Sequence, residues 1–333
     1  MKRGTLAVAA LLLAACLAAT GGRATAKRQP RIGFVAFSGT VPSKRTLDGQ
    51  TLAGFLQAQR QLDFQGRVVY VGPTQDPAAA MTLLARQKYD LIIVGIPRID
   101  VVYAVARKFP HVRFFPTDMA RQGPKHKPKN VQGAVYLDEE AGYLAGYLAA
   151  LVESRTPGKH VISAVGGIPF EGVNRWTVGY RAGARKADPN VTVKVGYSSD
   201  FANPAKCRRV ALRQLAEGSG VVLNVAGPCG LGTLSAAKEE GAWGIGVDVD
   251  QAYLGPHILT SALMKLDKGT FAVVQSFVRG KLAAHRNTVF DLHNDGVGLG
   301  RTSPRVERSL RLRVDAIRKA IIAGKIQVPP PTR

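Results

Sequence analysis

Short apolar runs alternate along this chain with longer segments in which apolar residues recur at helical spacing. In the first half the apolar runs are RIGFVAF (31–37), RVVYV (67–71), DLIIVG (90–95) and VRFFPTD (112–118). The segments between them, 49–62, 76–87 and 98–109, have the apolar spacing of helices. Strands that alternate with helices in this way predict a parallel sheet covered by helices.

The second half of the chain repeats this scheme. Its strand-like runs are HVISAVGG (160–167), VTVKVGY (191–197), VVLNVAG (221–227) and WGIGVDVD (243–250), and helices fit at 171–187, 204–217 and 230–240. The pattern therefore predicts an α/β protein with two parallel sheets.

After residue 250 the order of the elements changes. A strand is expected at 258–264, a helix from about Asp267 to Arg279, a strand and a Gly-rich turn in 287–300, and a last amphipathic helix at 304–323. These late elements predict repeated crossing between two lobes, so that each lobe is discontinuous in sequence.

The segment DEEAGYLAGYLAALV (138–152) lies where the first sheet ends and the second begins. Its leading acids suit the first turn of a helix, where free N–H groups and the helix dipole favour negative charge. Its glycines and alanines allow another backbone to approach closely. The segment is predicted to be a packing helix at the start of the second lobe, and its length and acids exclude a membrane span.

The N-terminus has the pattern of an export signal. Lys2 and Arg3 precede an apolar run, Leu6 to about Ala19, that is too short for a typical membrane span. Residues 1–26 are interpreted as a signal peptide with two competing processing sites. The favoured site is a lipobox at 13–16, which would leave Cys16 lipid-modified and anchored to the membrane; the other is small-x-small at 24–26, which would release a free chain. Either site predicts a periplasmic or cell-surface protein.

Composition and charge narrow the function classes. The roughly 300 residues after the leader usually form two domains, and an apolar content of 46% is ample for packed cores. The net charge is +23, from 46 basic and 23 acidic residues. The basic residues are spread along the chain and no nucleic-acid-binding motif accompanies them, so a solvated basic surface is favoured over nucleic-acid binding.

The chain has three cysteines, and their pairing depends on the redox state of the compartment. If Cys16 is modified or removed, Cys207 and Cys229 remain, and an even pair in an oxidising compartment favours a disulfide. Cys207 falls early in a predicted helix and Cys229 just after the next strand, so the distance is plausible. Two separate buried thiols are the alternative. A metal site is not expected from two cysteines without a nearby histidine.

Catalytic motifs are absent from the sequence. No G-x-G-x-x-G follows the first strand, and neither G-x-S-x-G nor H-E-x-x-H occurs. The run GVGLG (296–300) precedes the last helix and does not lie in a leading βαβ unit, and the acids of DVD (248–250) are too few for a hydrolase metal site. The sequence predicts no catalytic chemistry and no cofactor.

Several motifs resemble one known family when they are taken in order. They are EEAGYLAGYLAAL (139–151), GYRAGA (179–184), FANPAK (201–206), AGPCGLGTLSAAKEEGAWGIGVDVDQAYL (226–254), LTSALMKLD (259–267) and NDGVGLG (294–300). Together they resemble the basic membrane protein family, whose members are extracytoplasmic substrate-binding proteins of ABC transporters. Characterised members bind purine nucleosides. The resemblance covers residues 130–325 well and 30–130 in outline.

The resemblance implies a type I periplasmic-binding-protein fold. Two Rossmann-like lobes are joined by a hinge of three crossovers, and the ligand lies in the cleft between them. On this chain the first lobe would take 31–134 plus about 260–287, and the second lobe 135–257 plus about 288–325. Ligands of open α/β sheets bind at the carboxyl ends of strands, and clefts between domains are common ligand sites.

Four candidate ligand residues follow from the resemblance. Asp248 ends a strand, and its carboxylate would accept hydrogen bonds from sugar hydroxyls. Phe201 would stack on a planar base. Gly227 would let the backbone approach the ligand beside a helix N-terminus. Lys265 would reach the ligand from the hinge.

The loop after the first strand departs from the family. Members usually carry an Asp-rich loop with a Ser-Phe-Asn signature that holds the base, whereas this chain has AFSGTVPSKRTLDGQTLAGF (36–55). Other polar contacts are expected from Ser38, Gly39, Thr40 and Asp48. Asp118, at the end of a first-lobe strand, is a further cleft candidate. The sugar-side contacts therefore look retained and the base-side contacts altered.

The favoured function is a solute-binding protein that closes its lobes around a nucleoside-like molecule and presents it to the permease of an ABC transporter. The main alternative is a sensing module that docks to a membrane signalling partner after it binds ligand. An enzyme acting on nucleosides or sugars is less favoured, because the motifs above are absent.

Overall fold

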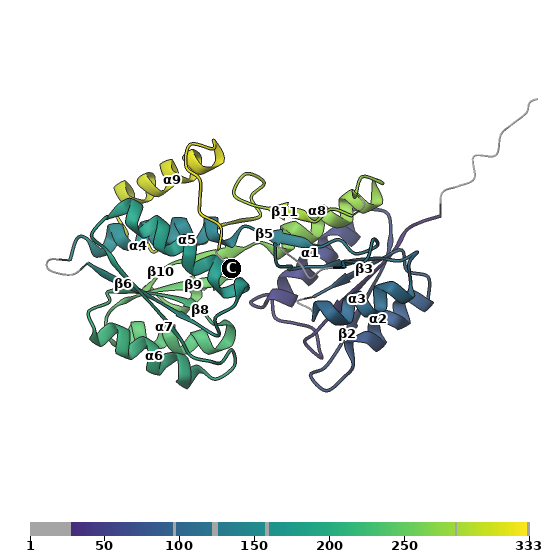
Figure 1. The fold of residues 1–333 in the computed structure, drawn as a ribbon, viewed down its shortest axis with the longest axis horizontal. Coiled ribbons are helices and arrows are strands. Elements are labelled where there is room, and N and C mark those ends of the chain that lie inside the picture. The colour runs from purple at the N-terminus through teal and green to yellow at the C-terminus, as the bar shows by residue number, and fades with distance from the viewer. Residues whose placement is uncertain (1–27, 96–97, 122–125, 157–159, 284, 332–333) are drawn as a thin grey trace, which may run out of the picture.

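The computed structural model describes residues 28–95, 98–121, 126–156, 160–283 and 285–331 (Figure 1). The predicted signal peptide, 1–26, and the predicted lipidation site Cys16 lie outside the described residues. The described chain forms two α/β lobes side by side, joined by a narrow waist (Figure 1).

The first lobe is built on a parallel sheet of four strands in the order β2-β1-β3-β4. The strands are β1 (Arg31–Ala36), β2 (Gln65–Tyr70), β3 (Leu91–Val94) and β4 (Arg113–Pro116). Its helices are α1 (Leu47–Gln61), α2 (Pro77–Arg86), α3 (Ile99–Lys108) and α8 (Leu266–Val278).

Successive side chains of β1 enter two different cores, which explains why helices cover both faces of this sheet. Phe34 belongs to the core beneath α1 and α8, whereas its neighbour Val35 belongs to the core beneath α2 and α3. Successive side chains of a strand point to opposite faces, so a continuous apolar strand requires cover on both sides.

The second lobe is built on six strands in the order β12-β10-β9-β8-β6-β7, all parallel except β12. They are β6 (Val161–Gly166), β7 (Thr192–Tyr197), β8 (Val221–Val225), β9 (Trp243–Asp248), β10 (Ile258–Met264) and β12 (Val297–Leu299). Helices α4 (Asp138–Glu153) and α5 (Glu171–Ala187) cover one face, with α9 (Arg308–Ile322) beyond α4, while α6 (Pro204–Ala216) and α7 (Gly230–Glu239) cover the other (Figure 1). Two short 3-10 turns, η1 (Gly227–Cys229) and η2 (Ala252–Leu254), follow β8 and β9.

The chain passes between the lobes three times. It leaves the first lobe after β5 (Ala134–Tyr136), returns between β10 and α8, and leaves again after β11 (Thr288–Phe290). Strands β5 and β11 pair in parallel, and the rings of Tyr136 and Phe290 stack there with centroids 4.9 Å apart. The predicted α/β fold of two Rossmann-like lobes with a hinge of three crossovers is confirmed.

One expected boundary of the lobes differs. The sequence placed the return to the first lobe near residue 260, but β10 runs to Met264 within the second sheet and pairs with β9. The crossing therefore lies between Met264 and Leu266. An apolar run such as 258–264 fits a central strand of either sheet, so its pattern could not decide between them.

Helices α4 and α5 pack backbone to backbone. A methyl group added at Gly142 or Gly146 would lie 2.3 Å from the Trp176 carbonyl oxygen or 1.9 Å from that of Tyr180. The contact is reciprocal, because a methyl group at Gly179 would lie 1.9 Å from the Glu139 carbonyl oxygen. The helix predicted from DEEAGYLAGYLAALV is confirmed as a packing element, and its glycines have a steric reason.

Gly146→Ala is expected to destabilise the protein by at least about 2 kcal/mol, because the new methyl group meets backbone atoms that can move only with their helix. The midpoint of urea unfolding measures this. Gly72→Ala is the matched control, since a methyl group there finds its nearest heavy atom at 3.6 Å. Equal midpoints for the two variants would contradict the close packing.

Candidate functional site

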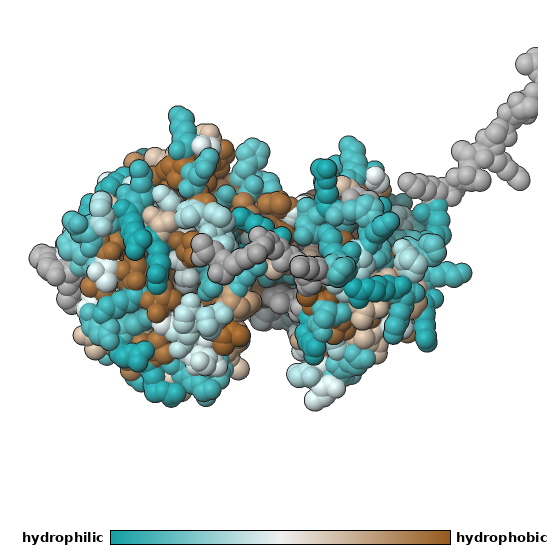
Figure 2. All heavy atoms as spheres, in the orientation of Figure 1, coloured by the Kyte–Doolittle hydropathy of each residue, from teal (hydrophilic) through white to brown (hydrophobic). Residues whose placement is uncertain are grey.

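A cleft opens between the two lobes, and the space-filling view shows the surface hollowed there (Figure 2). Two cavities in this cleft take residues from both lobes. The first, of about 370 Å³, is lined by Arg45, Thr46, Leu47, Asn224, Gly227, Pro228, Leu231, Val247, Asp248, Val249, Gln251 and Tyr253. The second, of about 340 Å³, is lined by Lys44, Arg45, Gln50, Asp248, Val249, Asp250, Leu263, Lys265, Asp267 and Lys268. Arg45, Asp248 and Val249 line both, so the two cavities meet at these residues.

Asp248 lies at the junction of the two cavities, at the carboxyl end of β9. The Val249 N–H donates to the Val247 carbonyl oxygen at 2.7 Å, and Asp248 between them has φ +65°. A three-residue turn with a positive φ at its centre is rare and strained, and strain of this kind is typical of ligand sites. Asp248 is half-buried at this turn and lines both cavities.

The surroundings of Asp248 raise the pKa of its carboxyl group. Burial raises its pKa to about 7, the negative charge of Asp118 adds to the rise, and Arg175 opposes it. The first lobe also touches this turn, because Gln50 Nε2 on α1 donates to the Asp248 carbonyl oxygen at 3.2 Å. Asp248 is therefore an acceptor whose charge responds to what binds beside it.

Gly227 and Phe201 lie together on the second-lobe side of the cleft. Gly227 has φ +52°, opens η1 and lines the first cavity. The Phe201 carbonyl oxygen accepts a hydrogen bond from the Cys229 N–H at 2.9 Å, which ties the two loops together. The Phe201 ring packs edge-on against Phe170, with centroids 6.1 Å apart, and does not line either cavity.

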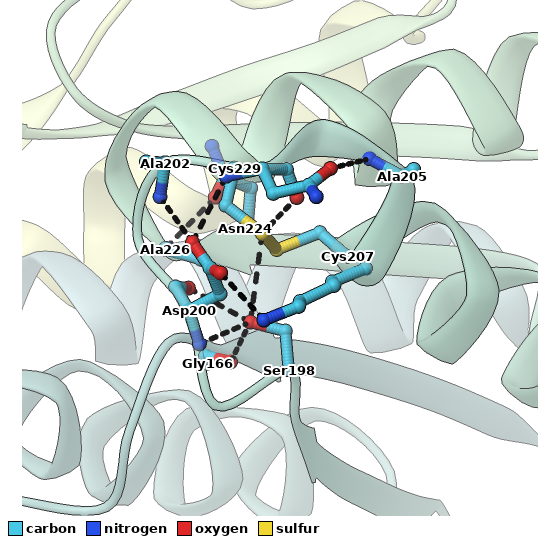
Figure 3. Close-up of a disulfide and its surroundings, with 11 residues drawn as sticks. Gly166, Ser198, Asp200, Ala202, Ala205, Cys207, Asn224, Ala226 and Cys229 are labelled. Carbon is cyan, nitrogen blue, oxygen red and sulfur yellow. Dashed lines mark hydrogen bonds and ion pairs between the residues drawn. A yellow bond between two sulfur atoms is a disulfide. The ribbon is translucent and has the colours of Figure 1, made fainter.

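A disulfide braces these loops (Figure 3). The Cys207 and Cys229 sulfurs are bonded at 2.10 Å, with the Cα atoms 5.6 Å apart, and join α6 to η1. Buried Asn224 stabilises the same turn, since its Oδ1 accepts from the Ala226 N–H at 2.9 Å (Figure 3). The disulfide thus holds the segment that carries Gly227 at the edge of the cleft.

Lys265 lies on the second crossing, immediately before α8, and lines the second cavity. Its ammonium group forms an ion pair with Asp295, and Lys268 contributes a second ion pair to the same carboxylate. The predicted position in the hinge agrees with the structure, while the side chain already has a protein partner.

Asp118 follows β4 and reaches across to the second lobe. One of its carboxylate oxygens lies 3.1 Å from Arg175 Nη2 on α5, and the same guanidinium lies 3.0 Å from Asp138 at the start of α4. Arg175 and Asp138 are almost fully buried. Burial lowers the pKa of Arg175, but the negative charges of Asp138 and Asp118 outweigh burial and raise it. The guanidinium therefore stays charged and connects the first lobe, the hinge and the second lobe.

Ser38 and Asp48 lie in a separate first-lobe cavity, which adjoins the first cavity through Thr46 and Leu47. The Ser38 hydroxyl donates to the Thr40 carbonyl oxygen at 2.5 Å. The Asp48 carboxylate accepts from the Phe37 N–H at 2.6 Å. Both polar groups therefore shape the loop after β1 rather than face Asp248.

Sequence reasoning predicted only Asp248 and Gly227 in the lining of the first cavity and missed its other polar and aromatic side chains. Arg45 places its guanidinium carbon 3.8 Å from the ring centroid of Tyr253 on the opposite lobe, a cation–π contact across the cleft. Buried Gln251 accepts from the Val247 N–H at 3.0 Å and lies beside buried Asn224. One of these residues had a signal in the sequence, because Asn224 is a polar residue within the apolar run VVLNVAG.

The described ranges contain neither a candidate metal site nor a candidate membrane span. There, no group of three or more His, Cys, Asp or Glu side chains could hold a metal ion. Over the same residues, no helix has both the length and the apolar character needed to cross a bilayer.

Several curated relatives cover most of the chain, and two of them illustrate the similarity. The chain is 30% identical over 266 residues to the ABC transporter nucleoside-binding protein BmpA of Lactococcus lactis subsp. cremoris, which covers 73% of this chain and 72% of that protein. It is 30% identical over 241 residues to basic membrane protein A1 of Borrelia garinii subsp. bavariensis, which covers 71% of this chain and 70% of that protein.

A solved structure supports the fold. The ABC transporter solute-binding protein of Aeropyrum pernix matches with a TM-score of 0.75 and 20% identity, over 92% of this chain and 94% of that chain. At this identity the likeness bears on the fold alone, and it confirms the periplasmic-binding-protein architecture.

The family itself is given by the sequence. Residues 50–331 match the family described as ABC transporter substrate-binding protein PnrA-like. Its members are solute-binding proteins, not enzymes, and work outside the cytoplasm. The chain belongs to this family, the basic membrane proteins, and is an ABC transporter substrate-binding protein.

Proposed function

We propose that this protein binds a nucleoside-like molecule in the cleft and delivers it to the permease of an ABC transporter. The observation that carries the proposal is the position of Asp248, on a strained turn where the two cavities meet. A carboxylate there can accept both hydroxyl groups of a ribose. The name of the Lactococcus lactis relative, a nucleoside-binding protein, points to the same ligand class.

The remaining contacts suit a polar solute with one apolar side. The first cavity combines the buried amides of Asn224 and Gln251 with apolar walls from Leu47, Leu231 and Val247. Pockets with mostly apolar walls and a few fixed polar groups are typical of small-molecule sites. In this proposal the base lies in the first cavity and the ribose at Asp248.

Lobe closure is the expected response to the ligand. The hinge consists of three short crossings, so the lobes are free to change their angle without loss of either core. Contacts already span the cleft, from Gln50 to the Asp248 carbonyl oxygen and from Arg45 to Tyr253. A ligand that touches both lobes stabilises the closed form through contacts that the open form lacks.

Export and membrane attachment complete the proposal. Both rest on the sequence, in which residues 1–26 have the pattern of a signal peptide and Cys16 ends a lipobox.

Two side chains are proposed to move when the lobes close. The ammonium group of Lys265 leaves Asp295 and contacts the ligand, and the ring of Phe201 turns from Phe170 toward the base.

Asp248→Asn is expected to weaken nucleoside binding by about 10- to 100-fold, because hydrogen bonds to a charged acceptor are stronger than those to a neutral amide. Protein that has been unfolded and refolded to remove carried ligand is titrated by calorimetry with purine and pyrimidine nucleosides. Glu240→Gln is the matched control, since it removes an exposed acid at the end of α7. If Asp248→Asn binds as tightly as the control, the proposed site is wrong.

Nucleoside affinity is expected to fall as the pH drops from 8 to 6. Sugar hydroxyls donate to the deprotonated carboxylate, and with a pKa of about 7 Asp248 loses this form across that interval. The deprotonated fraction decreases about tenfold between these pH values, so the affinity decreases by about the same factor. Calorimetry at each pH measures it, and Asp248→Asn is expected to remove the slope. An unchanged slope in that variant would assign the titration to another group.

A further inference from the structure

The second cavity differs from the first in its charge. Four cationic side chains line it, Lys44 and Arg45 from the loop before α1, and Lys265 and Lys268 at the start of α8. Arg45 is the single cation that also lines the first cavity among the residues described for it. The cations come from two segments that are far apart in the sequence and line one space.

Some charged side chains of this cavity have an ion-pair partner and others do not. Lys265 and Lys268 share the carboxylate of Asp295. Asp250 pairs with Arg301 at 2.8 Å. By contrast, Lys44 and Arg45 have no carboxylate within 4.0 Å among the described residues, and both are exposed to the cleft. Three acids, Asp248, Asp250 and Asp267, also line this cavity, so its four cations exceed its acids by one. The two cations that lack a carboxylate partner are Lys44 and Arg45.

The geometry of a nucleoside connects this charge to the ligand. When a ribose presents its 2′- and 3′-hydroxyls to Asp248, the base and the 5′-carbon extend from the ring in different directions. The two cavities share Asp248, and the first has mostly apolar walls whereas four cations line the second. A base that occupies the first cavity directs the 5′ substituent toward Lys44 and Arg45.

We propose that the natural ligand carries a negatively charged phosphate ester on its sugar, bound by Lys44 and Arg45 in the second cavity. This inference rests on the proposed function, because it places the sugar at Asp248. Arginine offers two parallel donors to phosphate oxygens and lysine a compact charge, and together they are the usual partners of a phosphate. Lys268, at the N-terminus of α8, closes the far side of the same space.

The loop that supplies these cations is the one that departs from the family. Its sequence is PSKRT (42–46), and Thr46 caps α1 by accepting from the Gly49 N–H at 3.1 Å. The cap fixes the start of α1 and so positions Lys44 and Arg45 immediately before it. The positive charges of Lys44 and Arg45 attract a phosphate.

The test compares each nucleoside with its own 5′-monophosphate, by calorimetry on the refolded chain, using adenosine, guanosine, inosine and uridine. In at least one pair the monophosphate is expected to bind about tenfold or more tighter than the nucleoside, a difference that falls with added NaCl. Lys44→Gln is expected to lower that ratio toward one and leave the affinity for the nucleoside within about twofold, because Lys44 lines the second cavity and not the first. Lys44→Gln/Arg45→Gln is expected to lower the ratio further and also to weaken nucleoside binding, because Arg45 lines the first cavity and contacts Tyr253. Lys281→Gln, an exposed lysine after α8, is the charge-matched control.

The other outcomes are separable. If a nucleoside binds as tightly as its monophosphate, or tighter, the phosphate inference is overturned and the proposed function stands. If inorganic phosphate alone binds as tightly as a monophosphate, the cations form a general anion surface and the inference is also overturned. If neither member of any pair binds, the nucleoside-like ligand class fails, and the inference fails with it. The single variant Lys44→Gln, which leaves the Arg45–Tyr253 contact intact, keeps the test valid if the double variant unfolds.

Discussion

The close approach of α4 and α5 is the constraint on which the rest of this structure depends. Glycines on both helices bring the two backbones together, and a methyl group at Gly146 or Gly179 would overlap a carbonyl oxygen. This packing sets the position of Arg175 on α5 relative to Asp138 at the start of α4. From there Arg175 reaches Asp118 across the cleft. A steric fit inside one lobe therefore fixes a charged contact between the lobes.

The polar groups of the cleft on the second-lobe side lie at the ends of parallel strands. Asp248 ends β9 and Gly227 follows β8, so backbone turns and a carboxylate meet at one edge of the second sheet. Buried amides at Asn224 and Gln251 support these turns, and the disulfide holds the loop beside them. The first lobe adds the cations Lys44 and Arg45. The second lobe thus supplies turns held by hydrogen bonds and a disulfide, and the first lobe supplies a charged loop.

Much of the fold was predictable from local pattern. Alternating strands and helices predicted two parallel sheets, and the strand end at Asp248 predicted a residue that does lie in the cleft. Local pattern could not assign β10 to its sheet, because an apolar run fits either one. It also left β5 undetected, since three residues are too few to show a period. Contacts between lobes, such as Arg175 with Asp118 and Arg45 with Tyr253, join segments far apart in sequence and leave no local signal.

A crystal structure of the refolded chain with a bound nucleoside is the most direct test of the central claim, that ligand binds between the lobes at Asp248. The account predicts electron density in the cleft with two sugar hydroxyls within hydrogen-bond distance of the Asp248 carboxylate, about 2.5–3.0 Å. It also predicts a smaller angle between the lobes than in the ligand-free protein. A ligand bound elsewhere, or a sugar held by other residues while Asp248 faces only water, would contradict the account.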